Sequence, residues 1–242
     1  MEFLIGATEY VRSKAVMTRI AKAPHERRRE LVAAAHQLFH TKGYNSTSVH
    51  DIVTAVGVAQ GTFYYYFGSK SEILEAVIEA LTAQTTELLC EIVADETLAA
   101  IPKWGRAVQA INDCKTERKD EMMALARLLQ DDGYALLQYK SWTMAIQMVV
   151  PELAKIIAQG VEEGVFDACP AEETAGIAFT ILQATSAAIV DILLNSEAYE
   201  RPLEFAWRKI AAGQTAIERV LGAPSGSLPI VDEQAMVAWF AG

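Results

Sequence analysis

The stretch TSVHDIVTAVGVAQGTFYYYFGSKSEIL, residues 47–74, decides the fold because it holds the start and stop signals of successive helices. Ser48 and Asp51 approximate a capping box, which predicts the first turn of a short helix, and Gly57 predicts its end. A second helix of about two turns fits residues 60–67. Two short helices joined by a tight turn that contains glycine form the helix-turn-helix pattern.

The second of these helices carries an unbroken aromatic run. At 100° per residue, Phe63 and Phe67 share one face, which we expect to pack on the two preceding helices, with Tyr66 half-buried at the edge. Tyr64 and Tyr65 then lie on the remaining circumference. A strand is possible locally, but the sequence offers no partner strand nearby. Ordinary packing of the tyrosines is the alternative to a contact surface.

A possible anion site follows the aromatic run. Ser69 and Glu72 form a second capping box, which predicts the start of a long helix reaching to about residue 95. Lys70 falls in the first turn, where a cation opposes the helix dipole, and a bound phosphate would reverse that penalty. Thr47 and Ser48 offer hydroxyl and N–H groups for another phosphate; simple capping is the alternative for Ser48, and the two roles can coexist.

The rest of the chain predicts further helices. Apolar residues repeat at three-four spacing from residue 25 to residue 42, and Gly43 provides a C-cap. Downstream we expect helices near 97–118, 120–131, 133–163, 171–196 and 202–221, with Pro151 kinking or splitting the helix that contains it. The sequence therefore predicts an all-α fold of about nine helices: a basic N-terminal arm at 1–24, a helix-turn-helix domain at 25–70, a helical body at 71–222, and a C-terminal tail at 223–242 whose Trp239 and Phe240 dock on the molecule.

The charge is divided between the two parts. The net charge is -10, yet residues 1–70 contain nine Lys+Arg and five Asp+Glu, whereas residues 71–242 contain 12 and 26. A basic head on an acidic body indicates two functional parts. The three cysteines are far apart and form no C-x-x-C motif, which suits a reducing cytoplasm. The N-terminus lacks signal-peptide features, and the apolar stretch 174–190 contains several polar residues, so we expect a buried helix there and no membrane partner.

Residues 71–242 contain no histidine. This argues against Ser-His or Cys-His nucleophilic catalysis and against a histidine-based metal site in the body. Adjacent acidic pairs such as Glu162-Glu163 point about 100° apart on a helix, which favours a solvated face over paired catalytic carboxylates. We therefore expect no enzyme activity, no cofactor and no metal.

The segments ERRRELVAAAHQLFHTKGY and TSVHDIVTAVGVAQGTFYYYFGSK, with the SEIL that follows, resemble the TetR family of bacterial transcriptional regulators. The resemblance covers about residues 26–75 and extends more weakly to GVEEGVF (160–166) and AIERVLG (216–222). It implies a homodimer whose two helix-turn-helix heads enter successive major grooves of a near-palindromic operator in double-stranded DNA.

The resemblance also implies DNA contacts, residue by residue. Positions that match base-contacting ones are His50, Gln60, Thr62 and Tyr64, with Gly61 allowing close backbone approach. Positions that match phosphate-contacting ones are Thr47, Ser48, Tyr65, Tyr66 and Lys70. Many family members have histidine where this chain has Tyr65.

In the family, the C-terminal body binds a small effector and forms the dimer. Small and apolar stripes on the last two long helices are our candidates for the dimer interface: Ile177, Ile181, Ala184, Ala188, Ile192, Phe205, Ala212, Ile217 and Leu221. Adaptable apolar side chains are our candidates for the walls of a pocket for a hydrophobic or aromatic effector: Trp104, Met122, Met123, Leu128, Trp142, Met144 and Met148. Packing within one protomer is the alternative for both sets.

The sequence thus favours a cytoplasmic, ligand-responsive, dimeric transcriptional regulator, most simply a repressor released by its effector. Two alternatives remain open at this stage. One is a helical enzyme or small-molecule carrier with a vestigial DNA-binding head, and the other is a DNA-binding protein that responds to no ligand.

Overall fold

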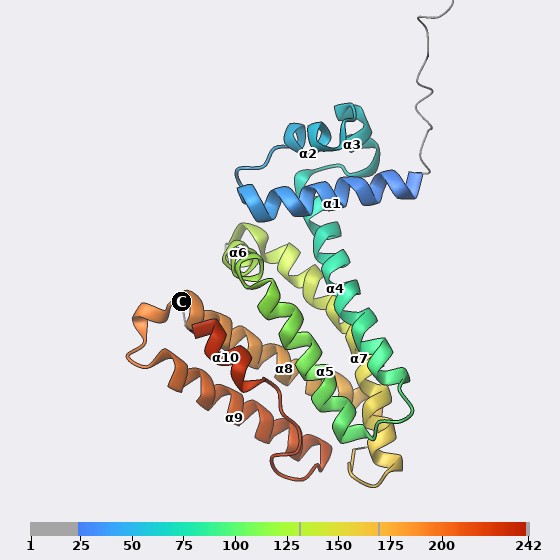
Figure 1. The fold of residues 1–242 in the computed structure, drawn as a ribbon, viewed down its shortest axis with the longest axis vertical. Coiled ribbons are helices and arrows are strands. Elements are labelled where there is room, and N and C mark those ends of the chain that lie inside the picture. The colour runs from blue at the N-terminus through green and yellow to red at the C-terminus, as the bar shows by residue number, and fades with distance from the viewer. Residues whose placement is uncertain (1–23, 131, 169, 241–242) are drawn as a thin grey trace, which may run out of the picture.

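The computed structural model describes residues 24–130, 132–168 and 170–240, and every regular element in them is helical, which confirms the predicted all-α class. The long and short helices form a small head and a larger body, as Figure 1 shows. The elements are α1 (Pro24–Lys42), α2 (Val49–Val56), α3 (Gln60–Tyr66), α4 (Lys70–Ala94), α5 (Ala100–Glu117), α6 (Lys119–Leu129), η1 (Asp132–Tyr134), α7 (Ala135–Glu162), α8 (Ala171–Leu194), η2 (Ser196–Ala198), α9 (Pro202–Leu221) and α10 (Glu233–Phe240). The predicted basic arm lies outside the described residues except for Pro24.

The head consists of α1, α2, α3 and the first turns of α4. Its core consists of apolar residues, of which Leu31, Ile52, Phe63 and Ile73 are fully buried. The three-four spacing of apolar residues on each short helix brings these side chains to one centre. Leu137 of α7 also belongs to this cluster, so the body contributes to the core of the head.

Helix α4 connects the two parts. Ile73, Val77 and Ile78 near its start lie in the head core, whereas Leu89 near its end lies in the body core. In Figure 1, α4 descends from the head alongside α7, and the remaining helices pack beside and behind them. One continuous helix therefore belongs to both cores.

The body core is built by α5, α7, α8 and α9. Trp104, Ile156, Ile157 and Ile217 are among its buried members. Helix α7 runs unbroken through Pro151, which corrects the prediction that the proline splits it. The prediction of a kink at this residue stays a prediction.

The C-terminal segment folds back onto the body. We expected a linker and a tail, but residues 233–240 form helix α10, which packs on α5. The Trp239 indole N–H donates to the Thr116 hydroxyl at 2.9 Å, and Phe240 packs against the body core, so the predicted docking of both residues is confirmed. Trp104 on α5 donates its indole N–H to the carbonyl of Pro229 at 2.8 Å.

A buried carboxylate anchors the loop before α10. Glu218 on α9 is buried and accepts from the amide of Gln214 at 2.9 Å and from the backbone N–H of Leu228 at 3.2 Å. Burial alone raises the pKa of this carboxyl, but hydrogen bonds from Gln214 and from backbone N–H groups of residues 226–228 outweigh it and lower the pKa. The loop is thus held by an ionised group inside the body.

Helices α7 and α8 are long and apolar enough to cross a membrane, judged by length and composition. Both pack in the body of this structure, where α8 lies between α7 and α9. Core helices of soluble proteins meet the same criterion, so this property is weak support for a membrane span.

Candidate nucleic-acid interface

Helix α2 is fixed at both ends by its own sequence. The Ser48 hydroxyl accepts from the Asp51 N–H at 3.1 Å, and the Asp51 carboxylate accepts from the Ser48 N–H at 2.7 Å, so the predicted capping box is complete. Lys42 at the end of α1 pairs with the same carboxylate at 2.8 Å. At the other end Gly57 adopts the left-handed conformation, with φ 70°, that lets the chain turn into α3.

Helix α3 is anchored on one side and exposed on the other. Phe63 is fully buried and Phe67 nearly so, and Tyr66 is half-buried, as predicted. Tyr64 and Tyr65 keep 54% and 77% of their surface exposed. The outer side of α3 is therefore exposed and open to contact by a partner.

The predicted base-contacting residues are accessible to a partner. His50, Gln60, Gly61 and Tyr64 are exposed, and Thr62 is half-buried. A Cβ added at Gly61 would meet no atom within 4 Å, so the space in front of this residue is open. These residues are thus accessible on two helices that contact each other, which agrees with the helix-turn-helix pattern.

One of the predicted phosphate contacts, Thr47, needs correction, and a second, Ser48, has a capping role. Thr47 is buried, its hydroxyl donates to the carbonyl of Gly43 at 2.8 Å, and its N–H donates to the carbonyl of Tyr44. Its side chain therefore fixes the loop between α1 and α2 and does not face a ligand. Ser48 is exposed, but its N–H and hydroxyl are engaged with Asp51, so capping is its role in this structure.

Lys70, which the sequence indicated as a phosphate contact, also forms contacts within the protein. Its ammonium donates to the carbonyls of Tyr44 and Thr47, both at 2.9 Å, and lies 4.2 Å from the centre of the Tyr44 ring. Burial lowers the pKa of this ammonium. Because an ammonium has three N–H donors, these two bonds leave one for a phosphate oxygen. Lys70 thus ties the start of α4 to the loop before α2.

The second capping box is formed differently from the prediction. The Ser69 hydroxyl accepts from the Glu72 N–H at 3.1 Å, as expected. The Glu72 carboxylate, however, accepts from the N–H of Gly68 at 2.6 Å, one residue earlier than in a standard box. The carboxylate therefore closes the turn between α3 and α4.

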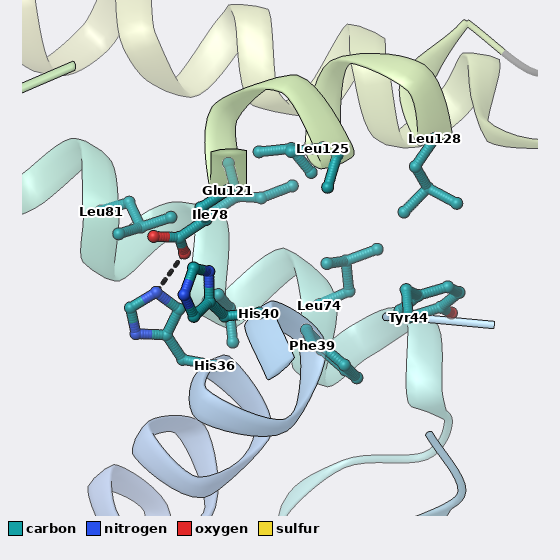
Figure 2. A pocket seen from close by; sticks show the side chains of 12 residues that line it. His36, Phe39, His40, Tyr44, Leu74, Ile78, Leu81, Glu121, Leu125 and Leu128 are labelled. Atoms are coloured by element: carbon teal, nitrogen blue, oxygen red, sulfur yellow. Dashed lines mark hydrogen bonds and ion pairs between the residues drawn. The ribbon is translucent and has the colours of Figure 1, made fainter. Parts of the chain in front are cut away.

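The head rests on the body through polar and aromatic contacts (Figure 2). His36 on α1 pairs with Glu121 on α6, and Figure 2 shows the two side chains directed toward one another. Tyr44 packs edge-on against Tyr134 of η1, with ring centres 5.8 Å apart. Burial is the largest reason why the pKa of Tyr44 is raised to about 12. Sequence periodicity gave no signal for this junction because the partners are far apart in the chain.

A small cavity of about 50 Å³ lies behind the His36–Glu121 pair, between α1, α4 and α6. A water molecule occupies about 30 Å³ in the liquid, so this cavity is far below the size of an effector pocket. Leu128, which we predicted as a pocket wall, lines this cavity and packs against the head core. It is a junction residue.

The other predicted ligand-wall residues are dispersed. Trp104 is fully buried and hydrogen-bonded, so it is a core residue, which corrects its assignment as a wall. Trp142 keeps 41% of its surface exposed. The methionines are half-buried: Met122, Met123, Met144 and Met148.

The predicted dimer residues divide into two groups. Ile192, Ile217 and Leu221 are buried within the protomer, which corrects their assignment to an exposed face. Ile177 and Phe205 keep 53% and 39% of their surface exposed. Ala184 and Ala212 are also exposed, and Ile181 and Ala188 are half-buried.

Residues 31–77 match the family described as bacterial regulatory proteins of the tetR family. The helix-turn-helix region of the chain thus matches the TetR family. The matched residues cover the C-terminal part of α1, all of α2 and α3, and the start of α4. These elements build the candidate interface described above.

Curated TetR-family relatives are similar over the same region. The uncharacterized HTH-type transcriptional regulator YvdT of Bacillus subtilis is 40% identical over 58 residues, which is 24% of this chain and 30% of the relative. The HTH-type transcriptional repressor KstR2 of Mycobacterium tuberculosis is 34% identical over 62 residues, 26% of this chain and 31% of the relative. The aligned segments thus span about a third of these relatives' own length.

Solved TetR-family structures share the whole fold. A regulator from Pectobacterium atrosepticum matches with a TM-score of 0.62 and 19% identity over 83% of this chain and 97% of that chain. A regulator from Haloarcula marismortui matches with a TM-score of 0.58 and 18% identity over 79% and 98%. At these identities the likeness shows the fold alone.

Proposed function

We propose that this chain is a ligand-responsive, dimeric transcriptional repressor that binds a near-palindromic operator. The observation that carries the proposal is the exposed face of α3, where Tyr64 and Tyr65 stand out from a helix that Phe63 anchors in the head core. A helix held rigidly by its inner side and exposed on its outer side suits insertion into the major groove. Gln60 and Tyr64 would read bases, and Tyr65, Tyr66 and Lys70 would contact phosphates.

The charge distribution favours docking by the head. Residues 24–70 contain five Lys+Arg and three Asp+Glu, a net charge of +2, whereas residues 71–242 carry a net charge of -14. DNA phosphates attract the first and repel the second, so only the head approaches the duplex closely. The acidic body stays away from the DNA and is available for other contacts.

Dimerisation through α8 and α9 is part of the proposal. Ile177 and Phe205 are exposed large apolar side chains, and small residues near them permit close approach of helices. A two-fold dimer would present two α3 helices to half-sites about one DNA turn apart. Replacing Ile177 by Glu would put a charge into that interface and produce monomers.

Communication between body and head would run through α4 and the junction. Helix α4 belongs to both cores, and the His36–Glu121 pair together with the Lys140–Glu75 bridge at 2.8 Å fastens the body to the head. An effector that favours another arrangement of α6 and α7 would shift α4 and change the separation of the two α3 helices. Operator affinity would fall by the coupling free energy.

The proposed function is tested by sedimentation of the purified protein with and without DNA. We expect a dimer at micromolar concentration that binds one operator duplex as a dimer, and monomers for Ile177→Glu. The matched control is Val237→Glu on α10, an equally exposed apolar residue outside the proposed interface, which should leave the dimer intact. A wild-type protein that is monomeric both free and on DNA would refute the dimeric repressor.

A further inference from the structure

Helix α6 packs on the core of the head and not on the core of the body. Its apolar side chains lie against the buried cluster of the head: Leu125, Leu128 and Leu129. Within the described residues, no apolar side chain of α6 packs against the buried cluster of the body, and none is itself buried. Glu121 on α6 adds the contact to His36 on α1 (Figure 2). Helix α6 therefore belongs to the packing of the head, although it also lies near α7 and α8.

The end of α5 has no apolar anchor of its own. Val108 is the last residue of α5 that packs against the body core. In the part of the chain that the structure describes, residues 109–118 belong to neither buried cluster. The corner where α5 meets α6, residues 116–119, is held by polar contacts instead. One of them leads to α4, where Arg118 donates to the side-chain oxygen of Gln84 at 2.8 Å.

Helix α10 supplies two further contacts of this corner. The Trp239 indole N–H donates to the Thr116 hydroxyl at 2.9 Å. The Lys119 ammonium donates to the backbone carbonyl of Ala238 at 3.1 Å. Two neighbouring residues of α10 thus bind the last turn of α5 and the first residue of α6. In Figure 1, α10 accordingly lies against the body beside α5, which it contacts.

The inner side of α10 is fixed in the core of the body. Met236 is buried in that core, and Phe240 packs against it. The segment before α10 is fixed as well, because the Trp104 indole N–H donates to the carbonyl of Pro229 at 2.8 Å. A helix of the body core therefore fastens the corner that leads into a helix packed on the head.

We propose that α10 is a strap that positions α6, and through α6 the head, relative to the body. While α10 is docked, its two bonds fix the start of α6, and the packing of α6 on the head fixes the head in turn. When α10 undocks, α6 and the head keep their mutual packing but lose this connection to the body core. The consequence for DNA rests on the proposed function: two heads that are held less firmly lose more conformational freedom on an operator, so their affinity falls.

Hydrogen exchange of the purified full chain tests whether α10 holds α6. Trp239→Phe removes the bond to Thr116 and keeps an aromatic ring in place. We expect the amides of residues 119–129 to exchange about two- to tenfold faster, as for the loss of one hydrogen bond, and those of residues 150–160 in the body core to stay unchanged. Val237→Ala, which changes an exposed residue of the same helix, is the matched control and should leave both regions unchanged.

Operator affinity tests whether the strap acts on the head. A labelled duplex selected from a random pool is titrated with each variant and followed by fluorescence anisotropy. Trp239→Phe should bind at least about threefold more weakly than the wild type, because its heads are less preorganised, and Val237→Ala should bind equally. If α10 only stabilised the body, Trp239→Phe would lower the melting temperature and leave the affinity unchanged.

Three results would overturn the inference: unchanged exchange of residues 119–129 in Trp239→Phe, an equal acceleration of residues 150–160, or an unchanged affinity for the operator. If Trp239→Phe does not fold, Lys119→Met decides the matter, since it removes the other bond of the strap and must give the same pattern. A wild type that binds no operator would count against the proposed function, and hydrogen exchange would still decide whether α10 holds α6.

Discussion

Replacement of Lys70 by Met separates two roles that the structure gives to one side chain. The ammonium donates to the carbonyls of Tyr44 and Thr47 at 2.9 Å each and lies over the Tyr44 ring. Hydrogen bonds from a charged group contribute about 1.5–3 kcal/mol and a cation–π contact about 0.5–1 kcal/mol. Desolvation of the ammonium opposes these contributions, so we expect Lys70→Met to lower the free energy of unfolding by about 2 kcal/mol.

The same substitution should change the salt dependence of operator binding. If the third N–H of Lys70 contacts a phosphate, the slope of log affinity against log salt loses about 0.9 per head, or about 1.8 for a dimer. The slope is measured by fluorescence anisotropy with a labelled operator between about 50 and 200 mM salt. Lys209→Met removes the same charge from the exposed side of α9 and should alter neither the slope nor the stability.

Chemical denaturation and the salt titration together decide between the roles. A loss of stability with an unchanged slope would refute the phosphate contact and leave Lys70 as a purely structural tie. An unchanged stability would refute the assignment of the two carbonyl bonds as stabilising, because the methionine side chain cannot form them.

Four further substitutions, one of them a control, test other parts of the account. Gln60→Ala should change which operator variants bind best, as measured by competition among them, and an equal loss for all variants would contradict base reading. Hydrogen bonds from Lys42 and Ser48 hold the pKa of Asp51 well below its usual range, so ionised Asp51 stabilises the head above about pH 4, and this stabilisation is lost as the pH falls further. Asp51→Asn should therefore flatten the acid part of the plot of melting temperature against pH. An unaltered plot would show that Asp51 is not responsible. Gly160→Ala should destabilise the body by about 1–3 kcal/mol in denaturant titrations, because the new Cβ would lie 2.1 Å from the Phe166 ring. In the control Gly105→Ala the new Cβ meets nothing within 4 Å, so this substitution should stabilise α5 by up to about 1 kcal/mol. Equal effects of the two substitutions would refute the close packing at Gly160.

The head could be predicted from the sequence because its signals are local. The capping box at Ser48, the left-handed Gly57 and the spacing of Phe63 and Phe67 each act within one or two turns of helix, and the structure has all of them. The direction of long or branched polar side chains was not predictable in this way. Thr47 turns back to the carbonyl of Gly43 in its own loop, and Lys70 reaches the carbonyls of Tyr44 and Thr47, which lie 26 and 23 residues earlier in the chain.

The body was harder to predict because its contacts are distant in the chain. A helical stripe identifies an apolar face but not what covers it, so Ile217 and Leu221 were assigned to a dimer surface although they pack inside the protomer. Helix α10 escaped prediction because its stability comes from contacts with α5, such as the bond from Trp239 to Thr116.

Selection of bound DNA from a random pool tests the central claim most directly, because one consensus reports both the binding class and the symmetry. We predict an inverted repeat whose half-sites are centred about one helical turn, roughly 10 base pairs, apart. Enrichment of a single unrepeated half-site, or of no sequence at all, would contradict a dimeric operator-binding repressor.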